Sequence, residues 1–285
     1  MKNSIKFLVC FVSIIVLAFN NFAQGTGVSV NTLPYEEIHS GVDRPVPYQH
    51  VREADVMWSR IIWRRIELSE KMNHVLALPE EPNRGSMSLI DVLLDGIHTK
   101  GLTAYKAKAS DAGNEFNLIM TEDDVHKEMG ASKIVPTDPN DPTPPQDIPY
   151  RSAEINSYIV KELWFFDKQR SVLDVRIIGL CPIRRYYRPD DINYERPMYK
   201  KVFWINYLEA RPLLAKSPIY SPYTDVKNLT YDDIFQKRLF SSYIFMESNP
   251  YNRAIIQYES GLEVLLEADR IKNEIFNIEQ DMWNY

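Results

Sequence analysis

Two apolar runs separated by a short charged segment dominate the middle of the chain, in KELWFFDKQRSVLDVRIIGL at residues 161–180. The runs Tyr158–Phe166 and Val172–Leu180 have the length and the β-branched and aromatic content of strands. Asp167–Ser171 joins them and is short enough for a hairpin turn. A third run, Val202–Tyr207, predicts another strand. The pattern therefore predicts a small antiparallel sheet built around a central hairpin.

Charged residues lie inside both runs of this hairpin. Alternation along a strand places Glu162 on one face of the first run and Arg176 on one face of the second. We expect the two to form a cross-strand ion pair, which would specify strand pairing and leave no carboxylate free for proton transfer. Cys181-Pro182 is expected to end the second strand. The basic, tyrosine-rich segment 184–200 is expected to be a long surface loop.

An apolar pattern with a period near 3.6 residues predicts a helix over residues 51–74. Its two irregular positions are Arg65, in the middle of the apolar face, and Trp63, on the opposite polar face. Arg65 is either a core-edge arginine with a buried stem or a buried arginine paired with a carboxylate. Trp63 is either covered by its own fold or part of a protein interface, where tryptophan is enriched. The apolar face carries Met57, Trp58, Ile61, Ile62, Leu68 and Met72.

Capping residues mark two further helices before the sheet. Ser88 is the expected N-cap of a helix that ends near Gly96 or Gly101. Thr121 begins another helix, with acidic residues in its first turn. The short strands expected between these helices are Thr103–Lys106 and Glu115–Met120.

The C-terminal region predicts a long pair of helices. The first runs from the N-cap Thr230 to about Glu247, and the second spans roughly Tyr251 to Met282. A helix with two apolar rows must be covered on two sides. Either both rows of the second helix pack on the first helix and the sheet, or one row meets another chain. The heptad row holds Val264, Ala268, Ile271, Ile275, Ile278 and Met282, and the other row holds Tyr258, Leu262, Leu265 and Phe276.

The order of these elements predicts an α+β fold, with the sheet packed by N-terminal helices and the long C-terminal pair. Residues 1–24 have the basic start and apolar run of a secretory signal peptide. Residues 25–50 are expected to be an extended arm. The six prolines of 136–149 predict an extended linker. It separates a subdomain at 51–135 from the sheet and C-terminal helices at 150–285, and the two are expected to form one compact unit.

Composition narrows the classes of function. Removing Lys2 and Lys6 with the signal peptide lowers the basic residues from 33 to 31, against 39 acidic ones, for a net charge of about −8. An acidic chain without a basic block is not expected to bind nucleic acid. Cys181 is the one cysteine of the two that remains, so no intrachain disulfide is expected.

The sequence lacks the common motifs of catalysis and metal binding. The five histidines have no metal-ligand spacing, and there is no HExxH, phosphate loop or nucleophile elbow. Cys181 is expected to be a buried small hydrophobe. Adjacent carboxylates at Asp123/Asp124, Asp190/Asp191 and Asp232/Asp233 fit helix starts or loops better than acid–base catalysis. The chain is therefore expected not to be an enzyme and to hold no cofactor and no metal.

Six long segments, in order along the chain, resemble one family, GldN, also called PorN. They are DVMWSRIIWRRIELSEKMN (55–73), SLIDVLLDGIHTKGLTAY (88–105), KELWFFDKQRSVLDVRIIGL (161–180), VFWINYLEARPLLAK (202–216), LTYDDIFQKRLFSSYIFMESNPYNR (229–253) and LLEADRIKNEIFNIEQDMW (265–283). The family is a periplasmic component of the type IX secretion and gliding-motility machinery.

The resemblance implies a structural role without catalysis. Members are expected in the periplasm, without a membrane span of their own, and associated with the outer membrane through the lipoprotein GldK/PorK. They form a ring with that lipoprotein and are expected to self-associate within it. They are also expected to meet the periplasmic part of GldM/PorM, so that the ring is coupled to the GldL–GldM motor. The resemblance supplies no catalytic residues to carry over.

Two other functions remain open on the sequence alone. A secreted hydrolase would use the acidic pairs, with one raised carboxyl pKa in a cleft. A periplasmic small-ligand binder would need an enclosed apolar pocket. For the structural role, the expected interface residues are aromatic or arginine side chains on otherwise polar surfaces: Trp63, Arg170, Arg184, Arg185, Tyr186 and Tyr187.

Overall fold

The computed structural model describes most of the chain after residue 43, within the unit that spans His39–Tyr285. The expected signal peptide, most of the expected arm, and residues 136–145 and 149 of the expected linker lie outside the described residues. The described ranges are 44–82, 85–107, 115–134, 146–148, 151–188, 195–220, 229–251 and 253–283.

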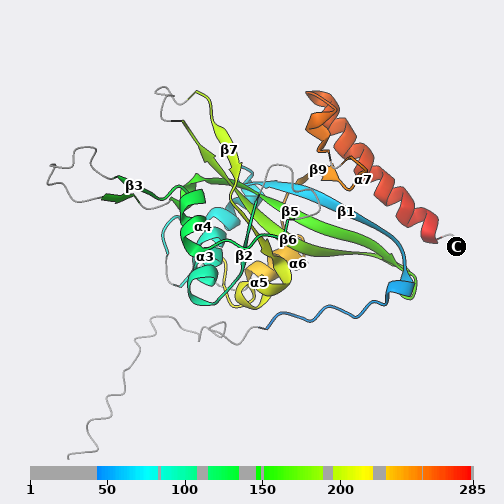
Figure 1. Ribbon diagram of the computed structural model, residues 1–285. Helices are drawn as coiled ribbons and strands as arrows, with labels where there is room; N and C mark the ends of the chain where they lie inside the picture. The colour runs from blue at the N-terminus through cyan, green and yellow to red at the C-terminus, as the bar shows by residue number, and fades with distance from the viewer. Residues whose placement is uncertain are drawn as a thin grey trace, which may run out of the picture. The chain divides into compact units, whose positions relative to one another are not determined.

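A seven-stranded antiparallel sheet forms the centre of this unit (Figure 1). Its order is β2-β8-β6-β5-β1-β9, and β7 pairs with β6 outside this path. The strands are β1 Val56–Glu67, β2 Ala104–Lys106, β5 Ile155–Asp167, β6 Val172–Tyr186, β7 Met198–Lys201, β8 Phe203–Asn206 and β9 Tyr243–Glu247. A separate two-stranded sheet pairs β3, Ser132–Ile134, with β4, Gln146–Ile148. Part of the expected linker is therefore a paired strand.

The central hairpin is present as β5 and β6, and the expected α+β fold is confirmed. The expected end of the second strand at Cys181-Pro182 is wrong, because β6 continues to Tyr186. Proline lacks a backbone N–H but keeps its carbonyl, and Pro182 O accepts from Val202 N at 3.0 Å. The last part of β6 pairs with β7, so segment 184–200 is only partly a loop.

The expected ion pair between Glu162 and Arg176 is also wrong. A bulge after Lys161 shifts the register, which places Glu162 opposite Ile177. The buried carboxylate of Glu162 instead accepts from Trp164 Nε1 at 2.9 Å and pairs with Arg238 Nη1 at 3.0 Å.

The helix expected over residues 51–74 is a strand in the structure. β1 lies between β5 and β9 and is covered on both faces, so it has no regular alternation of apolar and polar positions. Adjacent residues Ile62 and Trp63 are both buried, on opposite faces. Arg65 is half-buried and its Nε lies 2.6 Å from Glu67 Oε1, so it has the carboxylate partner of the second alternative but is not fully buried.

The two capped helices expected before the central hairpin are confirmed. Ser88 Oγ accepts from Asp91 N at the start of α3, Leu89–Thr99, and Thr121 caps α4, Glu122–Glu128. The strand expected over Glu115–Met120 is absent among the described residues, apart from a single bridge of Ile119 to β2. Short helical turns complete this part of the chain: Glu53–Asp55, Lys71–Asn73, α2 His74–Ala77 and Ser152–Glu154.

The largest apolar cluster joins the sheet to α3, α5 (Tyr207–Leu214) and α6 (Tyr231–Gln236). The expected helix from Thr230 to Glu247 is wrong beyond its first turns. Thr230 and Asp233 form a capping box, but Arg238 adopts a positive φ of 54° and the chain turns into the edge strand β9. The C-terminal pair is therefore a short helix, a strand and one long helix.

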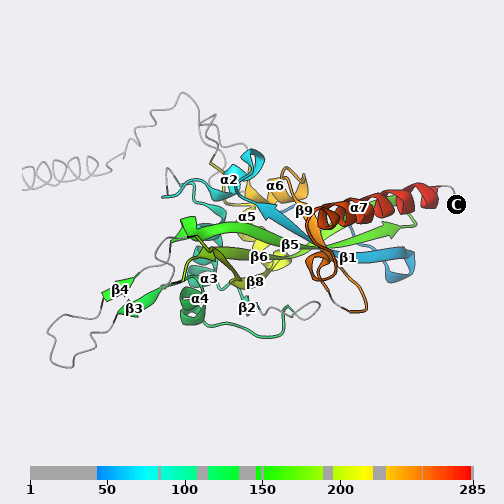
Figure 2. The same cartoon turned by 90° about the horizontal axis from the view of Figure 1, so that it is seen from above.

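That long helix is α7, Leu262–Trp283, which follows the short turn Ile255–Gln257. It packs on the side of β1 that carries Ile62, whereas Ile66 belongs to the α3, α5 and α6 cluster. Alternation puts Ile62 and Ile66 on the same side of β1. Because the strand twists, the direction in which this side faces changes along β1. The α7 helix and the other helices therefore lie on it at separate ends of the sheet (Figures 1 and 2).

Candidate protein-binding surface

The inward row of α7 is buried against its own sheet. Ala268, Ile271 and Ile275 are at most 7% exposed and cluster with Ile62 and Ile244. These three belong to the heptad row expected from sequence. The sheet provides the packing surface, since Trp58, Trp164 and Leu173 also pack against this cluster and no residue of α6 belongs to it.

The outward row of α7 is exposed. Of the sixteen large hydrophobic residues that are exposed in the described part of the chain, seven lie between Tyr251 and Phe276. Four of them follow the helix, and we call these four the α7 surface: Leu262 (69% exposed), Leu265 (55%), Leu266 (53%) and Phe276 (58%). Such a row of apolar side chains on one helix is typical of a protein interaction site.

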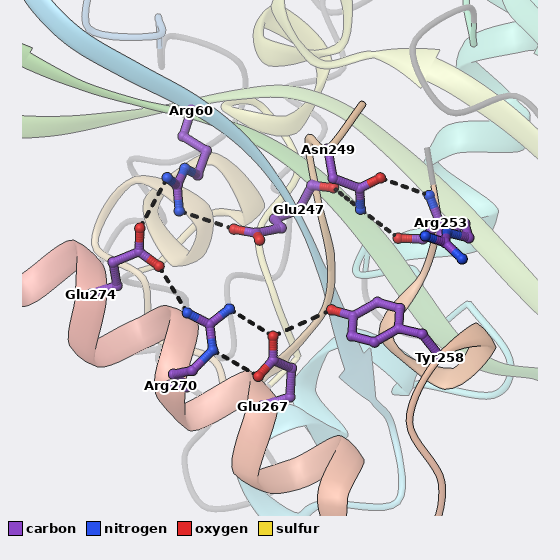
Figure 3. Close-up of polar contacts among 8 residues, drawn as sticks. All are labelled: Arg60, Glu247, Asn249, Arg253, Tyr258, Glu267, Arg270 and Glu274. Atoms are coloured by element: carbon purple, nitrogen blue, oxygen red, sulfur yellow. Dashed lines mark hydrogen bonds and ion pairs between the residues drawn. The ribbon is translucent and has the colours of Figure 1, made fainter. Parts of the chain in front are cut away.

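Ion pairs between polar side chains join α7 to β1 and β1 to the end of β9 (Figure 3). Arg60 of β1 reaches Glu247 at 3.0 Å and Glu274 of α7 at 3.1 Å. Arg270 contacts Glu274 at 3.2 Å and binds Glu267 through two nitrogen atoms at 2.7 Å. These contacts hold the pKa of Glu267 below its ordinary value, mainly because Arg270 donates hydrogen bonds to the carboxylate.

The turn before α7 has its own polar contacts. Tyr258 Oη donates to Glu267 Oε1 at 3.4 Å, and Asn249 Nδ2 donates to the backbone oxygen of Arg253 at 2.8 Å (Figure 3). The helix is therefore fixed at its inner side and near its start, while the α7 surface faces outward.

Arg60→Ala is expected to loosen α7 without unfolding the sheet. Arg60 is the one side chain that joins β1, β9 and α7 in this network, and its loss should cost about 1 kcal/mol because the pairs are only partly buried. Hydrogen exchange should accelerate in α7 more than in β5. Arg270→Ala is the control: it removes contacts that are mostly within α7, so its effect on exchange should be smaller. Equal exchange in Arg60→Ala and wild type would contradict the anchoring role.

Trp63, the first interface residue expected from sequence, is not on the surface. It is 3% exposed, and its Nε1 donates to Glu115 Oε1 at 2.9 Å. The expectation depended on a helix with a polar face, but strand β1 directs Trp63 into the cluster that also holds Trp204 and Cys181. Of the two alternatives for Trp63, the structure shows that this side chain is covered by its own fold.

The other expected interface residues remain at least partly accessible and lie at two places, the β5–β6 turn and the end of β6. Arg170 at the hairpin turn pairs with Asp167 at 2.7 Å and Asp174 at 3.1 Å. Arg184 pairs with Glu154 at 2.6 Å and lies over the ring of Tyr186. Arg185 is exposed, and Tyr186 and Tyr187 are half-buried. Their role at an interface stays a prediction.

The groups considered for catalysis have structural roles where the structure describes them. Asp232 is buried and pairs with Arg211, and Asp233 caps α6 and pairs with Lys237. Asp123 and Asp124 lie in the first turn of α4, and Asp190/Asp191 lie outside the described residues. Cys181 is fully buried, which raises the pKa of its thiol to about 12. Among the described residues, no group of histidine, cysteine and acidic side chains could hold a metal ion.

Leu266 of the α7 surface is not among the apolar positions expected from the sequence, which include Leu262, Leu265 and Phe276. The signal was present, because Leu266 follows Leu262 by four residues and lies on the same helical face. The sequence could not show which of the two rows of α7 would be covered.

Similarity to known proteins extends over most of the sequence. The family described as gliding motility associated protein GldN matches residues 51–284. A comparison with curated proteins finds no match. No helix in the part of the chain that the structure describes is long and apolar enough to cross a membrane. The matched range contains every named strand and helix of the structure, so this chain belongs to the GldN family of gliding-motility and type IX secretion components.

Proposed function

We propose that this protein is a non-catalytic structural subunit of the type IX secretion and gliding apparatus. In this role it forms a periplasmic ring with the lipoprotein GldK/PorK and couples that ring to the GldL–GldM motor. The match to the GldN family over residues 51–284 carries the proposal. The family is a secretion and motility component rather than a known enzyme family.

Two further observations support the proposal. The signal-peptide pattern at residues 1–24 favours export, and association with the outer membrane would then come from the lipoprotein partner. The α7 surface supplies exposed apolar groups that a subunit of an assembly needs and an isolated protein does not. The rest of the fold is well packed, with a large buried core that can carry such a surface.

The test is recovery of the tagged protein from native envelopes. It is expected to copurify with the lipoprotein and with the periplasmic part of GldM/PorM, and its deletion should abolish secretion of type IX cargo. Crosslinking mass spectrometry on the same material would identify the contact faces. Recovery as a free monomer, together with secretion that survives the deletion, would contradict the proposal.

A further inference from the structure

We propose that α7 pairs with the α7 of a second copy of this chain, in antiparallel orientation, through the α7 surface. This inference goes beyond the proposed function, because it assigns the residues, the orientation and the register of a contact between two copies. It needs no other component of the apparatus. It assigns a partner to the outward face that the fold leaves uncovered.

The apolar part of the contact begins with Leu262, which is followed three and four residues later by Leu265 and Leu266, and it ends at Phe276, ten residues further on. Leu262, Leu265, Leu266 and Phe276 are each more than half exposed. At 3.6 residues per turn they form one stripe along the outer side of a 22-residue helix. No other described helix or strand crosses that outer side (Figures 1 and 2). The stripe is therefore accessible to another helix.

The charged part of the stripe is self-complementary. Asp269 and Lys272 lie between the leucines and Phe276, on the same side of the helix, and both are exposed. No hydrogen bond or ion pair joins either side chain to another group in the described part of the chain. They are thus available to pair with a second helix.

The signs of these two charges select the antiparallel orientation. If two α7 helices ran parallel in register, Asp269 would face Asp269 and Lys272 would face Lys272 of the other copy, and like charges would repel. In an antiparallel pair centred between residues 270 and 271, Asp269 faces Lys272 of the other copy. The two-fold axis then creates this ion pair twice.

The same register also matches the apolar residues. With the centre between residues 270 and 271, Leu265 of each copy faces Phe276 of the other, and Leu266 lies beside this contact. An aromatic ring packed on two leucines would be buried at both ends of the pair. One register therefore satisfies the charged pair together with Leu265, Leu266 and Phe276, as expected of a contact in which both copies use the same patch. Leu262 faces Glu279 of the other copy and lies outside this apolar contact.

The inner side of α7 is already fixed, which favours this contact. The anchors to Arg60 and the buried row at Ala268, Ile271 and Ile275 hold the helix on its own sheet. Pairing would therefore not need to order α7 first, and the entropic cost of association is lower than for a flexible segment.

The first test measures the oligomeric state of purified residues 25–285 by sedimentation velocity over a range of concentrations. The wild type is expected to show a reversible monomer–dimer equilibrium. Leu265→Glu should weaken dimerisation by roughly tenfold or more, because a charge would be buried at the apolar contact. Leu208→Glu is the matched control, since Leu208 of α5 is 56% exposed against 55% for Leu265 but lies on another helix. It should leave the equilibrium unchanged.

The second test reverses the charges. Asp269→Lys alone would place lysine against Lys272, and Lys272→Asp alone would place aspartate against Asp269, so each should weaken dimerisation. The double variant Asp269→Lys/Lys272→Asp restores opposite charges across the two-fold axis and should recover the wild-type equilibrium. Circular dichroism on each variant checks that the total helix content is unchanged.

Several outcomes would overturn the inference. A wild type that stays monomeric at all concentrations would reject a second copy as the occupant, and would point to a helix of another protein. Failure of the double charge variant to recover dimerisation would reject the antiparallel register. These results are separable from the proposed function, because copurification with the lipoprotein uses a different readout.

Discussion

Glu115→Ala is expected to reduce the free energy of unfolding by about 3–5 kcal/mol, the range for breaking a buried ion pair from one side. Glu115 is 2% exposed and its Oε2 lies 2.6 Å from Lys161 Nζ, which is also buried. The other carboxylate oxygen accepts from Trp63 Nε1 at 2.9 Å. Without Glu115, both an ammonium and an indole N–H would be buried without their acceptor.

Nearby aromatic rings would compensate for only part of this loss. Lys161 Nζ lies 5.2 Å from the centre of the Trp63 ring and 5.9 Å from that of Phe116. Attraction to such rings is worth about 0.5–2 kcal/mol, less than the cost of an unpaired buried charge. The aromatic contacts therefore support the ion pair rather than replace it.

Urea denaturation measures the effect, with two comparison variants. Glu115→Gln keeps an acceptor for Trp63 but removes the charge, so it isolates the loss at Lys161. Glu115→Met/Lys161→Met removes both charges and should be less destabilising than Glu115→Ala, because no charge remains buried. A loss below about 1 kcal/mol for Glu115→Ala would show that water or another group replaces the carboxylate.

Arg211→Ala is expected to be the second large destabilisation, by about 3 kcal/mol or more. Arg211 of α5 binds Asp232 of α6 through two nitrogen atoms, at 3.0 and 3.1 Å, and both side chains are buried. Tyr207 Oη also donates to Asp232, at 2.8 Å. This single donor cannot neutralise the carboxylate, so loss of Arg211 leaves a buried charge where the two helices meet.

Arg211 also holds the segment that precedes β1. Its Nη2 donates to Val46 O at 2.7 Å, and its guanidinium lies 4.3 Å from the centre of the Tyr48 ring. Arg176 lies over the same ring at 5.1 Å. Residues 46–48 of the expected arm therefore lie against their own chain. Arg211→Ala should consequently speed proteolytic cleavage in this segment as well as lower stability.

Thermal unfolding and limited proteolysis test both effects. Arg211→Lys is the informative comparison, because lysine keeps the charge but lacks the planar group that binds a carboxylate with two nitrogen atoms. It should be intermediate in stability. The alternative outcome, normal stability with Arg211→Ala, would mean that Asp232 is not left charged and buried, and the account of the α5–α6 contact would be wrong.

The elements that local sequence predicts correctly are those with local causes. Ser88, Thr121 and Thr230 each supply a side-chain acceptor to a backbone N–H three residues later, so the helix starts depend on a few neighbouring residues. The β5–β6 hairpin has a short turn between two apolar runs. The inward row of α7 follows from its heptad spacing.

The elements that sequence predicts wrongly depend on distant parts of the chain. β1 resembles a helix because it is covered on both faces, and nothing within residues 51–74 specifies that coverage. β6 passes through Pro182 because β7 and Val202 supply partners from another segment. The bulge after Lys161 shifts the register of the hairpin, and Glu162 then binds Arg238, a residue 76 positions away.

The sequence by itself determined the family, the class of fold, the hairpin, the helix caps and the two apolar rows of α7, because these depend on residue order and local spacing. Tertiary structure decided that Trp63 is buried and that the row with Leu265 and Phe276 is exposed. Burial depends on which surfaces meet, and one face of the sheet can cover only one side of a helix. The surface available to another chain is therefore a property of the packed molecule.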